Sequence, residues 1–172
     1  SLDRNLAQFF TSTTECKTHV DKQEMESLPP RSLLQTRDPL PFLDLKQLRR
    51  KSEQGEAIAS LLFPFEDRLF LPLSPVMFNE QQFFEDLDYL VAAMQEEGVL
   101  EHVRFGLNNI GQASYFRKNQ LACFFDIYFY LANNEAAKLA LSMGLNVKGG
   151  YLWMERHELD DSTWPFTPAV VE

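Results

Sequence analysis

Cysteine is scarce in this sequence, and its spacing excludes the common metal sites. Cys16 and Cys123 are the only thiols among 172 residues, and neither belongs to a CxxC pair or to any four-ligand pattern. A zinc knuckle or an iron–sulfur cluster needs such a ligand set, so we expect the chain itself to hold no cofactor and no metal. Cys123 is expected to be a core residue, and Cys16 a free surface thiol.

Long apolar runs and an excess of positive charge are also missing. No stretch approaches the roughly 18 apolar residues that a membrane helix needs, and the first residues lack the basic and apolar regions of a signal peptide. Sixteen Lys and Arg against 25 Asp and Glu give a net charge of −9, so no uniform positive field attracts a phosphate backbone. We therefore expect a soluble, cytoplasmic protein for which membrane is not a partner and nucleic acid is an unlikely one.

The composition is that of a globular chain, and its first third differs from the rest. Hydrophobic residues make up 45% and charged residues 24%, which are ordinary values for a folded domain. Prolines at 29, 30, 39 and 41 prevent a long helix across residues 28–41. We divide the chain into an irregular N-terminal arm with short helices over residues 1–62 and a βα-repeat domain over residues 63–172. The acidic excess lies in the second part.

Extended and helical patterns alternate after residue 63. The expected strands cover residues 69–77, 102–107, 124–131 and 150–154. The expected helices cover residues 79–98, about 111–118, and 136–143. Asn79 is a candidate N-cap with Gln82 completing a capping box, and Gly98 ends that helix. The two prolines in the first strand predict an irregular or edge strand. Asp126, near the start of the third strand, is expected to be a solvated residue, with a buried and paired carboxylate as the alternative.

This order of elements predicts a parallel sheet, because each crossover helix returns the next strand in the same direction. The fold class is therefore α/β, with an open doubly wound sheet and part of a TIM-type (β/α) barrel as the alternatives. Four strands are too few to close an eight-stranded barrel. A barrel would then need the remainder of a parent polypeptide, or self-association, as its partner, and the chain would be a fragment of a longer protein.

Polar side chains follow every expected strand, at the edge where parallel sheets carry their sites. Asn109, Asn133 and Glu155 follow the second, third and fourth strands, and we take them as candidate substrate-binding residues that face a shared cleft. Two amides and a carboxylate suit a neutral polar ligand. The alternative is that the two Asn side chains satisfy turn backbones and Glu155 pairs with a cation. Asn79 and Asn134 are expected to be helix caps, and no catalytic residue can be assigned.

A family resemblance extends over residues 103–158. The segments that carry it are Asn109-Ile110-Gly111 after a short strand, Asp126 to Ala136 with its Asn-containing turn, Leu141-Ser142-Met143-Gly144 at the end of a small-residue helix, and Trp153-Met154-Glu155 at the end of a strand. In segment order and local pattern these are similar to the collagenase-like peptidase family, peptidase family U-thirty-two.

The resemblance implies a (β/α) barrel parent that is named as a peptidase. It also implies relatives that act as iron–sulfur hydroxylation factors for RNA or ubiquinone. The cluster cysteines of that family lie beyond the matched segment, so an iron–sulfur cluster is an expectation for the full-length parent only. The expected function is thus a non-catalytic portion of such a protein, and the alternative is a stand-alone acidic module that binds a protein or a small ligand.

Overall fold

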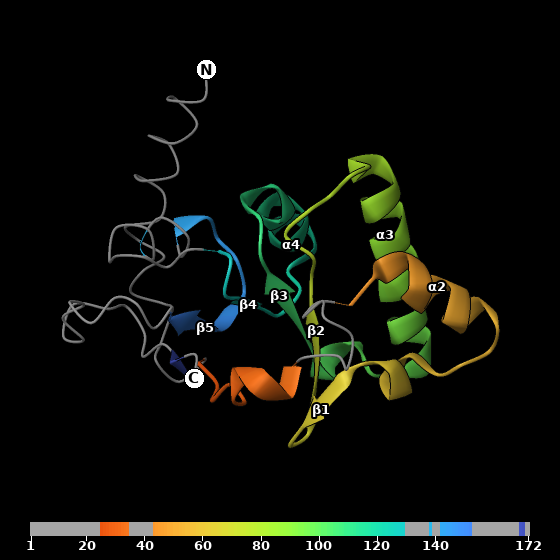
Figure 1. The fold of residues 1–172 in the computed structure, drawn as a ribbon, viewed down its shortest axis with the longest axis horizontal. Coiled ribbons are helices and arrows are strands. Elements are labelled where there is room, and N and C mark those ends of the chain that lie inside the picture. Colours follow the sequence, from red (N-terminus) through yellow and green to blue (C-terminus); the bar gives the residue numbers. More distant parts are fainter. Residues whose placement is uncertain (1–24, 35–42, 130–137, 139–141, 153–168, 171–172) are drawn as a thin grey trace.

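The computed structural model of the chain describes residues 25–34, 43–129, 138, 142–152 and 169–170. These residues form an α/β fold with a mostly parallel sheet and three α-helices. The strands lie side by side in the order in which they occur along the chain, from β1 to β6 (Figure 1). Within the described residues, β1 and β6 do not pair with each other, so the sheet is open.

The strands are short and the helices differ widely in length. The strands are β1 (Phe63–Phe65), β2 (Arg68–Pro72), β3 (Val103–Leu107), β4 (Cys123–Phe125), β5 (Val147–Leu152) and β6 (Ala169–Val170). The α-helices are α2 (Leu45–Glu53), α3 (Glu80–Glu97) and α4 (Ala113–Asn119). The 3-10 helices are η2 (Arg31–Leu34), η3 (Ile58–Leu61), η4 (Leu100–His102) and η5 (Ile110–Gln112).

The pairing of the strands confirms the predicted parallel sheet. β2, β3, β4, β5 and β6 pair in parallel in sequence order, and β1, which was not predicted, pairs antiparallel with β2. The expectation of an edge strand at the proline-containing segment is wrong, because β2 lies between β1 and β3, and β2 ends at Pro72, five residues before the predicted end. Pro72 is the last residue of β2, a position where a missing N–H group disturbs the hydrogen bonds of the strand least. The N–H of Leu73 then continues the ladder to the Gly106 carbonyl at 2.9 Å.

The long helix α3 begins and ends as its sequence predicts. The Asn79 side chain accepts a hydrogen bond from the Gln82 N–H at 3.1 Å, and Gly98 ends the helix with a φ of 75°. The reciprocal half of the expected capping box is not made, because the Gln82 side chain donates to Asp86 instead, at 3.0 Å. Leu87, Leu90 and Met94 bury the inner stripe of the helix against the sheet.

The third strand is shorter than predicted. β4 ends at Phe125, and the Phe129 N–H donates to the Asp126 carbonyl at 2.9 Å in the turn that follows. The apolar sequence extends past the end of the strand. Its residue Phe129 lies in the following turn and stacks its ring on Phe125, with 4.5 Å between the ring centroids. β5 begins at Val147, three residues before the predicted start. Of the helix predicted over 136–143, only positions 138, 142 and 143 are among the described residues, and the first two are helical.

The α-helices of the described residues cover one face of the sheet. The buried apolar residues of α2, α3 and α4 pack in one cluster with Leu71, Phe105 and Phe125. The opposite face carries Phe70, Phe124 and Tyr151, which pack against Leu34 of η2 in a separate cluster. Figure 1 shows η2, in orange, and α4 on opposite sides of β3. We call residues 25–34 the strap, since this extended segment and its single 3-10 turn cover the face that the α-helices leave free.

Gly106 is the position in β3 that this packing makes most sensitive to substitution. A Cβ atom there would lie 2.6 Å from Cζ of Phe124 and 3.1 Å from Cα of Pro72. We expect Gly106→Ala to lower the free energy of unfolding by about 1–3 kcal/mol, because the methyl group overpacks a closed interior. Urea unfolding followed by circular dichroism measures the change.

Gly149→Ala is the matched control in β5. Its added Cβ would meet the Leu28 side chain at 3.2 Å, and that side chain is half-buried and can move. The control should lose clearly less stability than Gly106→Ala. Equal losses would show that the contact between Gly106 and Phe124 is not the tight point of the sheet.

Candidate functional site

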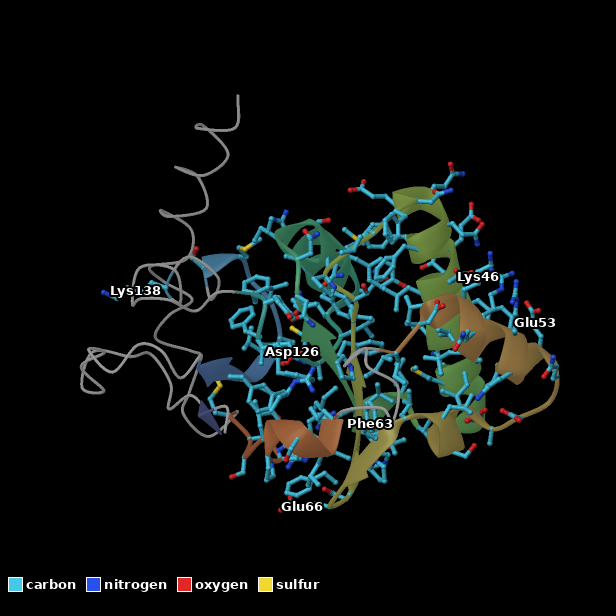
Figure 2. The ribbon with its side chains drawn as sticks, viewed as in Figure 1. Lys46, Glu53, Phe63, Glu66, Asp126 and Lys138 are labelled. Carbon is cyan, nitrogen blue, oxygen red and sulfur yellow. The ribbon has the colours of Figure 1, made fainter. Side chains whose placement is uncertain are left out.

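A buried ion pair lies where β4 ends. Nε of Arg31 in the strap donates to Oδ1 of Asp126 at 2.7 Å, and Nη2 donates to Oδ2 at 3.0 Å. The two side chains are 1% and 0% exposed. Figure 2 places Asp126 in the interior, whereas Lys46, Glu53 and Glu66 project from the surface. This two-point geometry is the strongest form of an arginine–carboxylate contact.

The remaining hydrogen-bonding groups of the pair are also occupied. Oδ2 of Asp126 accepts from Nδ2 of Asn108 at 2.8 Å, and Oδ1 accepts from the Ile127 N–H at 2.8 Å. Nη1 of Arg31 donates to the Leu34 carbonyl at 2.9 Å, within the strap itself. Burying two charges is favourable only when such additional bonds replace the lost water. The network meets this condition.

Asn108 links the ends of three neighbouring strands. Besides its bond to Asp126, Nδ2 donates to the Leu73 carbonyl after β2 at 2.7 Å, and Oδ1 accepts from the Tyr128 N–H after β4 at 2.9 Å. Asn108 itself follows β3 directly and is 3% exposed. One amide therefore fixes the carboxyl ends of β2, β3 and β4 relative to one another.

Asn109 and Gln112 build the turn beside this network. Oδ1 of Asn109 accepts from the Gly111 N–H at 2.8 Å, and its Nδ2 donates to the Pro75 carbonyl at 2.9 Å. Gln112 is fully buried, and its side chain accepts from the Asn108 N–H at 3.0 Å and donates to the Ser74 carbonyl at 2.7 Å. The segment after β3 is thus tied to the segment after β2 by side-chain amides.

The structure places one of the three candidate substrate-binding residues. Asn109 lies at the carboxyl edge of the sheet, as expected, and the two bonds above engage its side chain in the turn. Asn133 and Glu155 lie outside the described residues, as does Asn134. The shared cleft of Asn109, Asn133 and Glu155 therefore stays a prediction. The cap expected at Asn79 is confirmed.

Sequence reasoning missed the partner of Asp126 at this edge. The default expectation that Asp126 is solvated near the start of a strand is wrong, because β4 ends at Phe125 and Asp126 is 1% exposed; the alternative of a buried, paired carboxylate is confirmed. A carboxylate inside an apolar run does signal a need for a partner. The partner Arg31 lies 95 positions away in a segment with no helical or strand pattern, so no local signal identified it.

Reactive groups are few in the described residues. No group of three or more His, Cys, Asp or Glu in them is placed to hold a metal ion. Burial raises the pKa of the Cys123 thiol to about 12, so the nucleophilic thiolate is absent at neutral pH. None of the described helices has the length and apolar character needed to span a membrane.

The arrangement at the carboxyl edge is suited to holding strands in place. Both oxygens of Asp126 and both polar atoms of the Asn108 amide already bond to groups of the chain. Comparison of the chain with protein-family models, with curated proteins and with solved structures gave no match. The role of this edge is therefore inferred from its geometry.

Breaking the buried pair from either side should destabilise the fold strongly. Arg31→Met removes the guanidinium that pairs with a buried carboxylate, and Asp126→Asn removes the negative charge that pairs with a buried guanidinium. Each change should lower the free energy of unfolding by about 3–5 kcal/mol. Chemical unfolding of the single variants and of Arg31→Met/Asp126→Asn measures the coupling, and the double variant should lose clearly less than the sum of the two.

Glu53→Gln provides the control on an exposed ion pair. Glu53 accepts from Nε of Arg49 at 2.9 Å on the surface of α2, and the two side chains are 49% and 34% exposed. Its loss should leave stability almost unchanged, because solvent screens such a pair. If the single variants at Arg31 and Asp126 are as stable as this control, or if their effects simply add, the buried pair does not hold the strap.

The two neighbouring asparagines should differ in their contribution to stability. Asn108→Ala leaves the Leu73 carbonyl and the Tyr128 N–H without their side-chain partner in the interior, which costs about 1–3 kcal/mol. Asn109→Ala removes bonds in a part-exposed turn and should cost less. Thermal unfolding of both variants tests the order. A larger loss for Asn109→Ala would contradict the assignment of Asn108 as the link between strands.

Proposed function

We propose that this chain is a non-catalytic portion of a collagenase-like peptidase family protein, built as part of a TIM-type (β/α) barrel. The supporting observation is the winding of the sheet. From β2 to β6 each strand pairs in parallel with the next strand in sequence, without a reversal of order. A doubly wound sheet reverses its strand order at a switch point, whereas a barrel does not.

The one-sided placement of the helices supports the same proposal. In a (β/α) barrel the helices form an outer ring and the inner face of the strands is filled with side chains. Here α2, α3 and α4 pack on one face, while Phe70, Phe124 and Tyr151 fill the other beneath the strap. In the proposed parent, the strap face would be the interior of the barrel, and the carboxyl ends of the strands its working edge.

The buried side chains at that edge argue for a structural role of this portion. The side-chain polar atoms of Asp126 and Asn108 form hydrogen bonds within the chain itself. The Cys123 thiol is buried and protonated. An iron–sulfur cluster needs four ligands, most often cysteine, and the chain has two cysteines. The residues present do not fit that group, so no chemistry through it is assigned to this chain.

The ligand edge of the proposed parent would include Asn109, Asn133 and Glu155. Asn109 stands at the rim, half-buried, next to the network of Asn108 and Asp126. Its two turn bonds leave the second lone pair of its oxygen for a neutral polar ligand. The remaining strands would come from the rest of the parent polypeptide or from self-association.

A second candidate function has a specific observation in its favour. Three large apolar side chains are exposed in the segments after β2 and β3: Phe78 is 99% exposed, Ile110 61% and Val76 52%. Phe78 directly precedes the Asn79 cap, where a staple contact to the helix would normally bury it. Exposed apolar residues near one edge are typical of a binding surface, which would suit a stand-alone interaction module.

Two measurements test these functions, and the second of them separates the two. The purified chain should release no fragments from casein or gelatin, because the Cys123 thiol is buried and protonated and the described residues hold no group of His, Cys, Asp or Glu placed to bind a metal. The natural reading frame should continue into further βα units and into cysteines with cluster spacing. A complete reading frame of this length would overturn the barrel-portion proposal in favour of the interaction module, and proteolysis by the purified chain would contradict both.

A further inference from the structure

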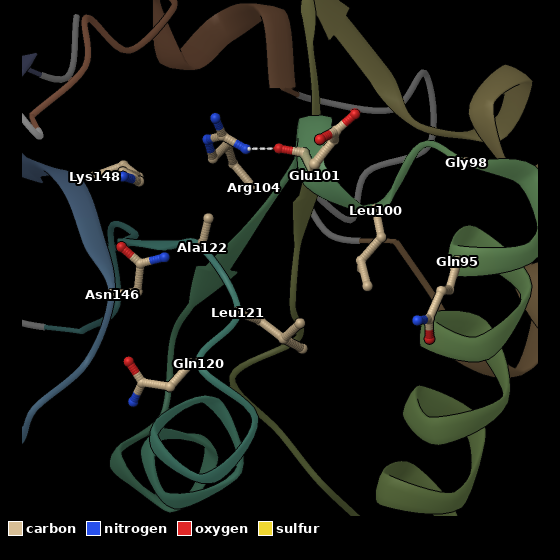
Figure 3. A pocket seen from close by; sticks show the side chains of 10 residues that line it. All are labelled: Gln95, Gly98, Leu100, Glu101, Arg104, Gln120, Leu121, Ala122, Asn146 and Lys148. Carbon is tan, nitrogen blue, oxygen red and sulfur yellow. Dashed lines mark hydrogen bonds between the residues drawn. The ribbon is translucent and has the colours of Figure 1, made fainter.

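An open pocket lies at the edge of the sheet where the strands begin, opposite the carboxyl edge. It measures about 550 Å³, within the roughly 300–1,000 Å³ typical of small-molecule sites. Residues that precede or open β3, β4 and β5 line it, together with the end of α3. Figure 3 shows Arg104, Lys148 and Asn146 along one side, and Gln95 and Gly98 of α3 on the other.

The wall of this pocket carries positive charge although the protein is acidic. Glu26 of the strap pairs with both Arg104 and Arg68 at 2.9 Å, and Arg68 also pairs with Glu66 at 3.1 Å, so two carboxylates balance these two guanidinium groups. Lys148 adds a half-buried ammonium with no hydrogen bond or ion pair to the part of the chain that the structure describes. The ammonium of Lys148 is thus the charge in this wall that favours an incoming anion.

Several donors in this wall are free to bind a ligand. Nε of Arg104 donates to Glu26 and Nη1 to the Glu101 carbonyl at 2.7 Å, which leaves Nη2 without a bond among the described residues. The ammonium of Lys148 and the side-chain amide of Asn146 have none in the same ranges either. The one carboxylate in the lining, Glu101, is 80% exposed and lies 3.5 Å from the His102 ring.

The floor of the pocket is apolar. Leu100, Leu121 and Ala122 line it below the cationic wall. A bare inorganic anion would leave these side chains in contact with water, whereas an organic anion would cover them. We propose that this pocket binds a small organic carboxylate, with the carboxylate at Lys148 and Arg104 and an apolar body over Leu121. This site is independent of the function proposed for the carboxyl edge.

Three matched probes test the charge and the apolar body separately. Benzoate carries both features, benzamide keeps the body without the charge, and inorganic phosphate keeps the charge without the body. Titration of the full chain, followed by backbone amide resonances, should shift Leu121, Ala122 and Asn146 with benzoate. Benzamide and phosphate should each bind at least about tenfold more weakly than benzoate, because benzamide lacks the charge and phosphate lacks the apolar body.

Variants at Lys148 assign the effect to this wall. Lys148→Gln should weaken benzoate binding by about tenfold, the loss of one charge-assisted hydrogen bond, and Lys148→Arg should keep most of the affinity. Lys118→Gln removes an equal charge from exposed α4, outside the pocket, and should change nothing. A melting curve of each variant shows that the fold is retained.

Three results would overturn the proposal. They are equal binding of benzoate and benzamide, binding of phosphate as tight as that of benzoate, and unchanged benzoate affinity in a folded Lys148→Gln variant. Failure of Lys148→Gln to fold would still leave the comparison of the three probes on the unchanged chain to decide. Each of these outcomes is separate from the tests of the barrel proposal, which concern other residues.

Discussion

The fold of the described residues depends on one buried contact, the ion pair between Arg31 and Asp126. It joins the strap to the end of β4, and through Asn108 it extends to the ends of β2 and β3. Lysine would not serve in its place, because only the guanidinium offers two parallel donors to a carboxylate and a third to the Leu34 carbonyl. The pair thus connects the strap to the sheet, and the apolar cluster around Phe124 packs next to it between the strap and the sheet.

The strap is secured by polar contacts at both ends, which explains how so little regular structure covers a sheet face. At its beginning Glu26 binds Arg68 and Arg104, and the Glu26 N–H donates to the Lys148 carbonyl at 2.8 Å. Further along, the Tyr151 hydroxyl donates to the Pro29 carbonyl at 2.6 Å. Pro29 and Pro30, which exclude a helix here, leave the backbone extended enough to reach across three strands.

The sequence predicts the parts of this fold that local rules govern. The caps of α3, its apolar stripe and the parallel direction of β3 and β4 all follow from spacing within a few residues. The end of β4 does not, because Phe129 extends the apolar run by stacking on Phe125 outside the strand. The predicted strand end at residue 131 lies six residues too late, so it placed Asn133 and not Asp126 at the carboxyl edge. The link made by Asn108 also has no local signal, since its bond to the Leu73 carbonyl spans 35 positions.

The strap also has a consequence for how the chain folds. Its bonds join residues 95 and 122 positions apart, at Arg31 and at Tyr151, whereas α2, α3 and β1–β3 contact partners that are much nearer in sequence. Contacts of such long range carry the largest loop-closure entropy and form late. The face that carries Phe70 and Phe124 therefore stays uncovered through the early part of folding. During synthesis this face stays exposed until β5, which carries Tyr151, has been translated. Association with other chains is most favourable in that interval.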